Sequence, residues 1–388
     1  MFASLLKKEI RNIFKSITFY ILILVVGFFC YEQFDEPYIP KAPITQSEAK
    51  QTGIQVNYGN KKITEPKKEI RAVYLELYDS YEQGFVYKVR IMLNTRANLS
   101  NEEKYYIKEA MEKIAPEEYL NNDNENLIKV SYDEYLNIIK DLDKKLGGST
   151  QYNEKNIKDM GILNESRTYE EAVEDYNNII NEDKITNAVA RYYSDYMGIT
   201  AGLFPIFLSA FILMKDKRNK MEELICSRSI SSCTYILSKY LALCICVFIP
   251  YLLIATYSTI GYYNLAKINN CTIDMLAFYK YSMFWILPTI CFTNAMGMII
   301  SIIFRNGIPA IFIQFILWIA TMMPLKGDYS LSRFMIRFNT LGHYSEYINW
   351  VNSIVINRIF YVIISFVLIF IACFIWSKKR GTIGERIK

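Results

Sequence analysis

Few residues of this chain combine the types and spacings that bond-making or metal chemistry requires. The 388-residue sequence contains one histidine, His343, which excludes two-histidine metal sites such as H-E-x-x-H. No glycine is followed by a lysine, so the chain has no G-x-x-x-x-G-K-[ST] phosphate loop and cannot hydrolyse ATP through one. His343 stands in an aromatic stretch, where a structural role is favoured over that of a general base in a membrane enzyme. The sequence therefore predicts no catalytic residue, no cofactor and no metal.

The cysteines are also interpreted as structural. Eight are present, and none lies in residues 32–195. The pairs Cys226/Cys233 and Cys244/Cys246 do not have the spacing of zinc ligands, so the cysteines are treated as small apolar residues. Exported regions of this size often carry disulfides, and their absence points to a Gram-positive bacterial surface.

Charged residues suited to recognising a partner are concentrated in one segment, residues 215–239. Its centre carries Glu222 and Glu223, with Arg228 a few residues further on. These 25 residues are too few for an enzyme domain but suffice for one short helix and a polar turn. We interpret the segment as a docking element, with a plain charged connector as the alternative.

Long apolar stretches surround this segment, and none contains Asp, Glu, Lys or Arg. A helix needs about 20 apolar residues, with a range of roughly 17–25, to cross a bilayer. The first stretch could be a signal peptide, but it ends in bulky residues instead of a small-residue cleavage site, which indicates a retained anchor. The sequence thus predicts an α-helical polytopic membrane protein with six transmembrane helices, at 16–31, 196–214, 240–263, 281–304, 307–325 and 359–376.

The distribution of Lys and Arg predicts the orientation of these helices. With the N-terminus inside, the inner segments carry 16 basic residues and the short outer loops carry 6. Both termini, including the tail at 377–388, are then cytoplasmic, and residues 32–195 are extracytoplasmic. The excess of positive charge at the inner margins suits the lipid bilayer, so nucleic-acid binding is not expected.

The region at 32–195 differs in charge from the remainder. It holds 22 of the 44 basic and 31 of the 39 acidic residues, which leaves it at −9 and the remaining residues at +14. Apolar spacing and caps predict helices at 101–114 and 131–146, and 85–91 is a strand candidate. From Tyr169 a helical pattern continues without Gly or Pro to Gly198, which predicts one long stalk. We expect a mainly α extracytoplasmic domain between helices 1 and 2.

Three further features concern the membrane part. Residues 1–15 form an amphipathic pattern with a basic polar face, typical of a helix lying on the inner leaflet, with a simple helix anchor as the alternative. Residues 326–358 are aromatic and amphipathic, which predicts an outer amphipathic or re-entrant segment. Within the spans, Asn294 and Gln314 are the costliest side chains to bury, and they either line a pathway or join helices.

The order of these segments, with the loop sequence DKRNKMEELICSRSISSCTYILSKYLAL, resembles ABC-2 type permeases, the membrane subunits of ATP-binding-cassette exporters. In that family the loop after the second helix commonly has an acidic residue and a leucine, then a turn, and a lysine that opens the third helix. The matching positions here are Glu222, Glu223, Leu224, 227–230 and Lys239. Ser229 departs from the pattern, because a proline is frequent there.

The resemblance implies that transport and ATP hydrolysis are carried out by different subunits. A separate ATP-binding-cassette ATPase would supply the energy, with Glu222, Glu223, Leu224 and Arg228 as its coupling residues. Six helices would form half of a translocation unit, so a second permease copy or a paralogue is expected. Relatives with a large domain after the first helix are linked to drug, peptide or sodium export.

We therefore expect a permease subunit in the cell membrane that exports a hydrophobic or amphipathic substrate, such as a drug, an antimicrobial peptide or a lipid. Spans without carboxylates favour such cargo over an ion-driven pump. The alternative is a membrane sensor or adhesion protein whose extracytoplasmic domain binds a ligand. A long stalk suits that alternative, but five further spans do not.

Overall fold

The computed structural model describes residues 2–387 except 35–36, 54, 91–92, 123, 219–220, 222–224, 226–229 and 324–325. The chain forms two compact units, each with its own hydrophobic core. The helical unit consists of Met1–Ala42 and Val173–Lys388, and the inserted unit consists of Pro43–Ala172. Each unit is described here by itself.

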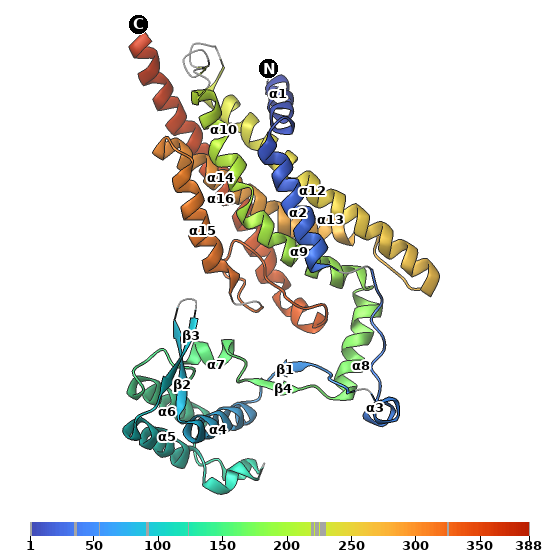
Figure 1. Ribbon diagram of the computed structural model, residues 1–388, viewed down its shortest axis with the longest axis vertical. Coiled ribbons are helices and arrows are strands. Elements are labelled where there is room, and N and C mark those ends of the chain that lie inside the picture. Colours follow the sequence, from blue (N-terminus) through green and yellow to red (C-terminus); the bar gives the residue numbers. More distant parts are fainter. Residues whose placement is uncertain are drawn as a thin grey trace. The chain divides into compact units, whose positions relative to one another are not determined.

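The helical unit contains helices whose apolar side chains lie in one large core (Figure 1). These helices are α1 (Phe2–Phe14), α2 (Ile17–Gln33), α9 (Thr186–Leu203), α10 (Ile206–Arg218), α12 (Ser232–Asn269), α13 (Ala277–Tyr281), α14 (Leu287–Phe304), α15 (Ile308–Met322) and α16 (Tyr344–Ile387). Helix α14 packs against α10, α12, α15 and α16 and is the central helix of the unit. Close approach of α10 requires glycine at position 297 of α14, because a Cβ there would collide with the Ser209 side chain.

Four helical segments of the described residues are long and apolar enough to cross a membrane. They are Thr186–Arg218, Ser232–Asn269, Ala277–Phe304 and Tyr344–Arg380. The pair α1 and α2, which bends by 68°, makes a fifth if it counts as one span. Helix α15 has 15 residues and is therefore only about 22 Å long, shorter than the roughly 30 Å of bilayer hydrocarbon. The described residues thus hold four or five candidate spans, where the sequence predicts six.

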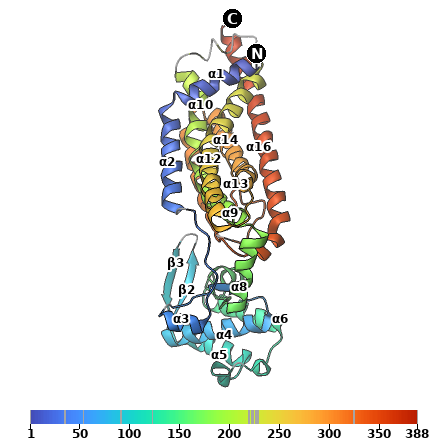
Figure 2. The ribbon, with the colours of Figure 1, turned by 90° about the vertical axis from the view of Figure 1, so that its right-hand side faces the viewer.

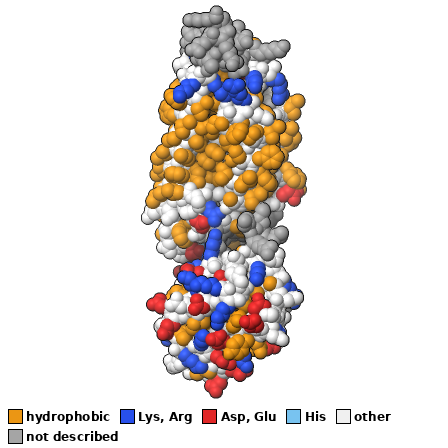
Figure 3. Space-filling model, turned by 90° about the vertical axis from the view of Figure 1, so that its left-hand side faces the viewer, with side chains coloured by type: hydrophobic (Ala, Val, Ile, Leu, Met, Phe, Trp, Pro, Cys, Tyr) orange, Lys and Arg blue, Asp and Glu red, His pale blue; other side chains and the backbone are white. Residues whose placement is uncertain are grey.

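The surface of the helical unit separates apolar side chains from charged ones. On the face drawn in Figure 3, hydrophobic side chains cover the unit in a broad band, and Lys and Arg side chains gather at one end of that band. Both chain termini lie at one end of the unit (Figures 1 and 2). The amphipathic helix expected at 1–15 is present as α1, where Leu6, Ile10 and Ile13 pack against the core.

The predicted single helix from Tyr169 to Gly198 is wrong. Helix α8 (Tyr169–Asn177) continues into a π-helical turn, Asn178–Glu182, and then the helix breaks. Lys184 and Ile185 have φ angles of 49° and 42°, which no α-helix contains, and α9 begins at Thr186. No glycine or proline marks this break.

The inserted unit is mainly helical, with two antiparallel pairs of strands. Its elements are α3 (Gln46–Thr52), β1 (Asn60–Lys62), α4 (Pro66–Gln83), β2 (Phe85–Arg90), β3 (Leu93–Asn98), α5 (Asn101–Ile114), α6 (Tyr132–Lys145), α7 (Glu154–Asp159) and β4 (Asn164–Ser166), with 3-10 turns at Glu117–Leu120 and Glu125–Leu127. Strand β1 pairs with β4, and β2 pairs with β3. The core lies among α4, α5 and α6.

The helices predicted in this unit are confirmed, and local caps explain them. Ser100 and Ser131 each accept a bond from the N3 backbone N–H, and the N3 glutamate bonds back, so both α5 and α6 begin with a capping box. The strand predicted from Phe85 is confirmed as β2, whose Val86 lies opposite Ala97 of β3.

Candidate functional site

The predicted docking segment stands between α10 and α12 in the sequence. The described ends of these two helices lie at the end of the helical unit that carries the termini (Figure 1). Helix α10 ends at Arg218 and α12 begins at Ser232. Glu222, Glu223, Leu224 and Arg228 lie outside the described residues. What the structure does describe is how the two ends of this segment are held.

A buried ion cluster joins three elements at this point. Lys239, near the start of α12, is only 2% exposed. Its Nζ lies 3.1 Å from Oε1 of Glu9 on α1 and 3.0 Å from Oδ2 of Asp216 on α10. The Tyr235 hydroxyl donates a further bond of 2.5 Å to Asp216. A buried ammonium group is tolerated when such partners compensate its lost hydration, so this cluster fixes α1, α10 and α12 to one another.

The last helix is attached to the same region. Trp376 of α16 stacks on Tyr235 with ring centroids 5.2 Å apart. The Arg380 guanidinium donates to the Ile230 carbonyl, just before α12, and Lys379 donates to the Ile302 carbonyl at the end of α14. Because of these contacts, a displacement of the ends of α10 and α12 would also displace α1, α14 and α16.

A second polar cluster lies in the core, where the helix Thr186–Arg218 is interrupted. Pro205 has no N–H, so the carbonyl of Ala201 lacks its helical donor. Thr293 of α14 donates to that carbonyl over 3.3 Å, and Nε2 of Gln314 on α15 donates to the Gly202 carbonyl over 2.6 Å. The side chains of two other helices thus satisfy backbone groups that the break exposes.

The contacts of Asn294 and Gln314 are both between helices. Asn294 Nδ2 lies 3.8 Å from Cys244 Sγ on α12, and both amides are fully buried. Among the described residues, Asn294 Oδ1 and Gln314 Oε1 have no hydrogen-bond partner. The donor side of each amide thus joins two helices, and the acceptor side is unused.

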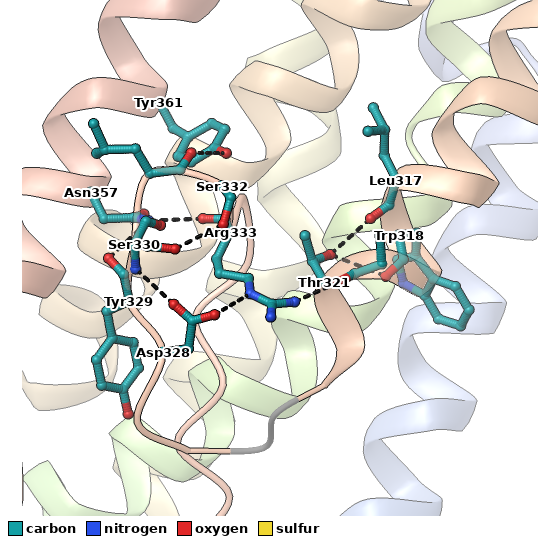
Figure 4. Close-up of polar contacts among 12 residues, drawn as sticks. Leu317, Trp318, Thr321, Asp328, Tyr329, Ser330, Ser332, Arg333, Asn357 and Tyr361 are labelled. Atoms are coloured by element: carbon teal, nitrogen blue, oxygen red, sulfur yellow. Dashed lines mark hydrogen bonds and ion pairs between the residues drawn. The ribbon is translucent and has the colours of Figure 1, made fainter. Parts of the chain in front are cut away.

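The segment between α15 and α16 has little regular structure, yet several of its side chains are buried. Figure 4 shows how polar side chains of α16 bind the backbone of this irregular segment. Asn357 Nδ2 donates to the carbonyls of Ser330, at 2.7 Å, and Arg333, at 2.8 Å. The Tyr361 hydroxyl donates to Leu331 over 2.8 Å. Since α16 starts at Tyr344, it includes part of the stretch predicted as an outer segment, together with the last span and most of the tail.

Within this segment, Asp328 accepts a bond of 2.7 Å from Nε of Arg333. Burial raises the pKa of the Asp328 carboxyl, but the bonds from Arg333 and Ser330 outweigh burial and hold the pKa below its ordinary value of 3.8. The carboxylate therefore stays charged and keeps the turn at 328–333 closed.

Five buried charged residues near this segment were missed in the sequence, because all of them lie outside the predicted spans. Arg191 forms a two-bond pair with Asp183, at 2.7 and 2.5 Å. Asp195 accepts bonds of 2.5 Å from Arg337 and 2.8 Å from the Phe338 backbone. The spacing of Arg191 and Asp195, four residues apart beside an apolar stretch, is the signal that could have revealed them.

Arg358 is the fifth of these residues, and it is 3% exposed. Its guanidinium donates to the carbonyls of Trp285 and Phe334, at 3.1 and 3.0 Å, and to Thr289 Oγ1 at 2.9 Å. These acceptors are neutral, so Arg358 links α14, α16 and the irregular segment through hydrogen bonds.

Within the part of the chain that the structure describes, no three His, Cys, Asp or Glu side chains are grouped so as to hold a metal ion. The polar clusters join helices to each other, and the apolar helices surround them. Together these features define a polytopic α-helical membrane protein.

The chain belongs to the ABC-2 family transporter proteins, whose family model matches residues 13–378. It is therefore the permease type of subunit, a multi-pass protein of the cell membrane, and membership implies association with an ATP-binding-cassette ATPase. The resemblance inferred from the sequence is confirmed. No curated protein and no solved structure matches the chain significantly.

Proposed function

We propose that this chain is the membrane half of an exporter that moves a hydrophobic or amphipathic substrate, such as a drug, an antimicrobial peptide or a lipid, with energy from a separate ATPase. Family membership supports the transport role over a sensor or adhesion role. The apolar spans support the class of substrate, because a small ion would require polar groups along its path. Asp195, a carboxylate just before the second predicted span, is already paired with Arg337.

The single observation that carries the coupling role is the ion cluster at Lys239. It holds α1, α10 and α12 together at both sides of the proposed docking segment, 215–239. We assign Glu222, Glu223, Leu224 and Arg228 to contact with the ATPase. A push on that segment would move the helices that the cluster joins, so the ion cluster would transmit the motion.

The proposed topology has six spans and both termini in the cytoplasm, which places the inserted unit outside. The position of both termini at one end of the helical unit supports an even number of crossings (Figures 1 and 2). In this topology α15 is the fifth span, although it is short, and the irregular segment after it completes the crossing. A second permease copy or paralogue would complete the pathway, and the cysteine-free inserted unit supports a Gram-positive membrane.

The experiment that tests the coupling role compares two matched double variants of the full chain, purified from native membranes with whatever ATPase remains bound. Glu222→Gln/Glu223→Gln removes the proposed contact. Glu117→Gln/Glu118→Gln makes the same change in an exposed acidic pair of the inserted unit. We expect the first variant to lose most of the substrate-stimulated ATP hydrolysis or the ATPase itself, and the second to behave as wild type. Normal stimulation in the first variant would remove these residues from the coupling role.

A further inference from the structure

A cavity of about 590 Å³ opens in the helical unit between α1, α10 and α12, and its size is that of a typical small-ligand site. Its lining contains both apolar and polar side chains. Ile13, Phe207, Phe211 and Leu243 contribute apolar walls. The polar lining residues, which we call its margin, include Ser16, Lys8, Lys215 and Arg218. The cavity therefore offers apolar walls beside a polar margin.

Three cations line that margin without a counter-ion. Lys8, Lys215 and Arg218 are exposed, and among the described residues none of them forms an ion pair. The two acids of the lining, Glu9 and Asp216, share one cation, Lys239, and that cluster keeps one net negative charge. The four basic and two acidic residues of the lining sum to +2. Among the described residues, the margin therefore carries a net positive charge.

The position of the cavity indicates what kind of ligand has access to it. Its cationic residues belong to the same end of the helices as the chain termini, where Lys and Arg gather beside the apolar band (Figure 3). In a membrane protein that boundary lies at the level of lipid headgroups. Basic pockets between helices at this level bind anionic headgroups.

We propose that this cavity binds one anionic phospholipid. The phosphate would lie against Lys8, Lys215 and Arg218, and an acyl chain would follow Phe207 and Phe211. The apolar walls favour a lipid over a free anion, which would leave that surface uncovered. The bound lipid would contact α1 and α10 beside the ion cluster and hold the two helices together. This inference depends on membership of a membrane protein family and does not require the coupling role.

The test measures lipid retained by the purified full chain in native mass spectrometry, with phosphatidylglycerol and phosphatidylcholine of identical acyl chains as probes. The cavity variant is Lys8→Gln/Lys215→Gln/Arg218→Gln. The matched control, Lys7→Gln/Arg11→Gln/Lys217→Gln, removes three exposed charges from the same two helices, none of which lines the cavity. Wild type should retain phosphatidylglycerol in preference to phosphatidylcholine. The cavity variant should bind it on the order of tenfold to 100-fold more weakly, and the control should change by less than about threefold.

Two outcomes would overturn the proposal. Equal losses in the two triple variants would mean that a diffuse positive surface, and not the cavity, attracts the lipid. Displacement of phosphatidylglycerol by millimolar inorganic phosphate alone would mean that the margin binds a free anion. If a triple variant does not purify, Lys215→Gln against Lys217→Gln makes the same comparison on one helix.

Discussion

At the scale of single residues, the side chains that organise this permease are charges placed where water is excluded. Lys239 has two carboxylate partners, and removing the cation would leave two acids close together without a positive charge between them. Removal of one partner from a buried ion pair costs about 3–5 kcal/mol, but the side chains of Glu9 and Asp216 retain 12% and 23% exposure. Solvent therefore screens part of that cost.

We expect Lys239→Ala to lower the free energy of unfolding by about 1–3 kcal/mol, because Glu9 and Asp216 then repel each other. Thermal unfolding of the purified chain in detergent measures this change. The control is Lys280→Ala, which breaks the 2.6 Å pair with Asp274 where the lysine side chain is 51% exposed, so its cost should stay within about 1 kcal/mol. Equal shifts in the two variants would contradict a special role for the ion cluster.

At the scale of elements, the break around Pro205 shows how one helix depends on its neighbours. The proline removes the backbone donor for the Ala201 carbonyl, and Thr293 of α14 supplies a replacement. Gln314 of α15 donates to the next carbonyl, that of Gly202. A hydrogen bond of this kind in a membrane protein contributes about 0.6 kcal/mol on average. Several hydrogen bonds, each with a small contribution to the free energy of unfolding, thus hold the broken helix against α14 and α15.

A double-mutant cycle tests this explanation. Thr293→Val should cost about 1 kcal/mol in the wild-type chain, because the Ala201 carbonyl loses its donor. With Pro205→Ala as background, the alanine N–H can reach that carbonyl, and we expect the cost of Thr293→Val to fall by at least half. Strictly additive effects in thermal unfolding would indicate that the threonine does not compensate for the proline.

At the scale of the whole molecule, two units with separate cores share one chain. Among its described residues, the inserted unit has a hydrophobic core of 18 buried side chains of its own. Strands β1 and β4 pair where the chain enters and leaves it, with Lys61 opposite Glu165. Such an arrangement is expected to fold without the helical unit.

We expect residues 43–172, expressed alone, to be soluble and to unfold in one cooperative transition. In this fragment Ile107→Ala should lower the free energy of unfolding by about 2–5 kcal/mol, because Ile107 is fully buried. Tyr105→Ala on the same helix is the control, and its cost should stay within about 1 kcal/mol, since Tyr105 is 64% exposed. A fragment without a cooperative transition would show that its core needs the remainder of the chain.

The features that could be predicted from the sequence are local ones. The apolar stretches identified the membrane helices, and the plausible cap at Ser100 identified the start of α5. These signals lie within one or two helical turns, so no knowledge of neighbours was needed. The break at Lys184 and Ile185 was missed for the opposite reason, because neither residue favours a positive φ and the Arg191–Asp183 pair stabilises the turn.

The sequence alone therefore determined where the apolar helices lie and that no phosphate loop is present. The tertiary structure decided which polar residues meet: Lys239 with Glu9, Arg337 with Asp195, and Gln314 with the Gly202 carbonyl. The physical reason is that a polar group in an apolar surrounding must find a partner, and the nearest partner in space is set by helix packing. These partners are more than a hundred residues apart in the sequence, so no local pattern could have paired them.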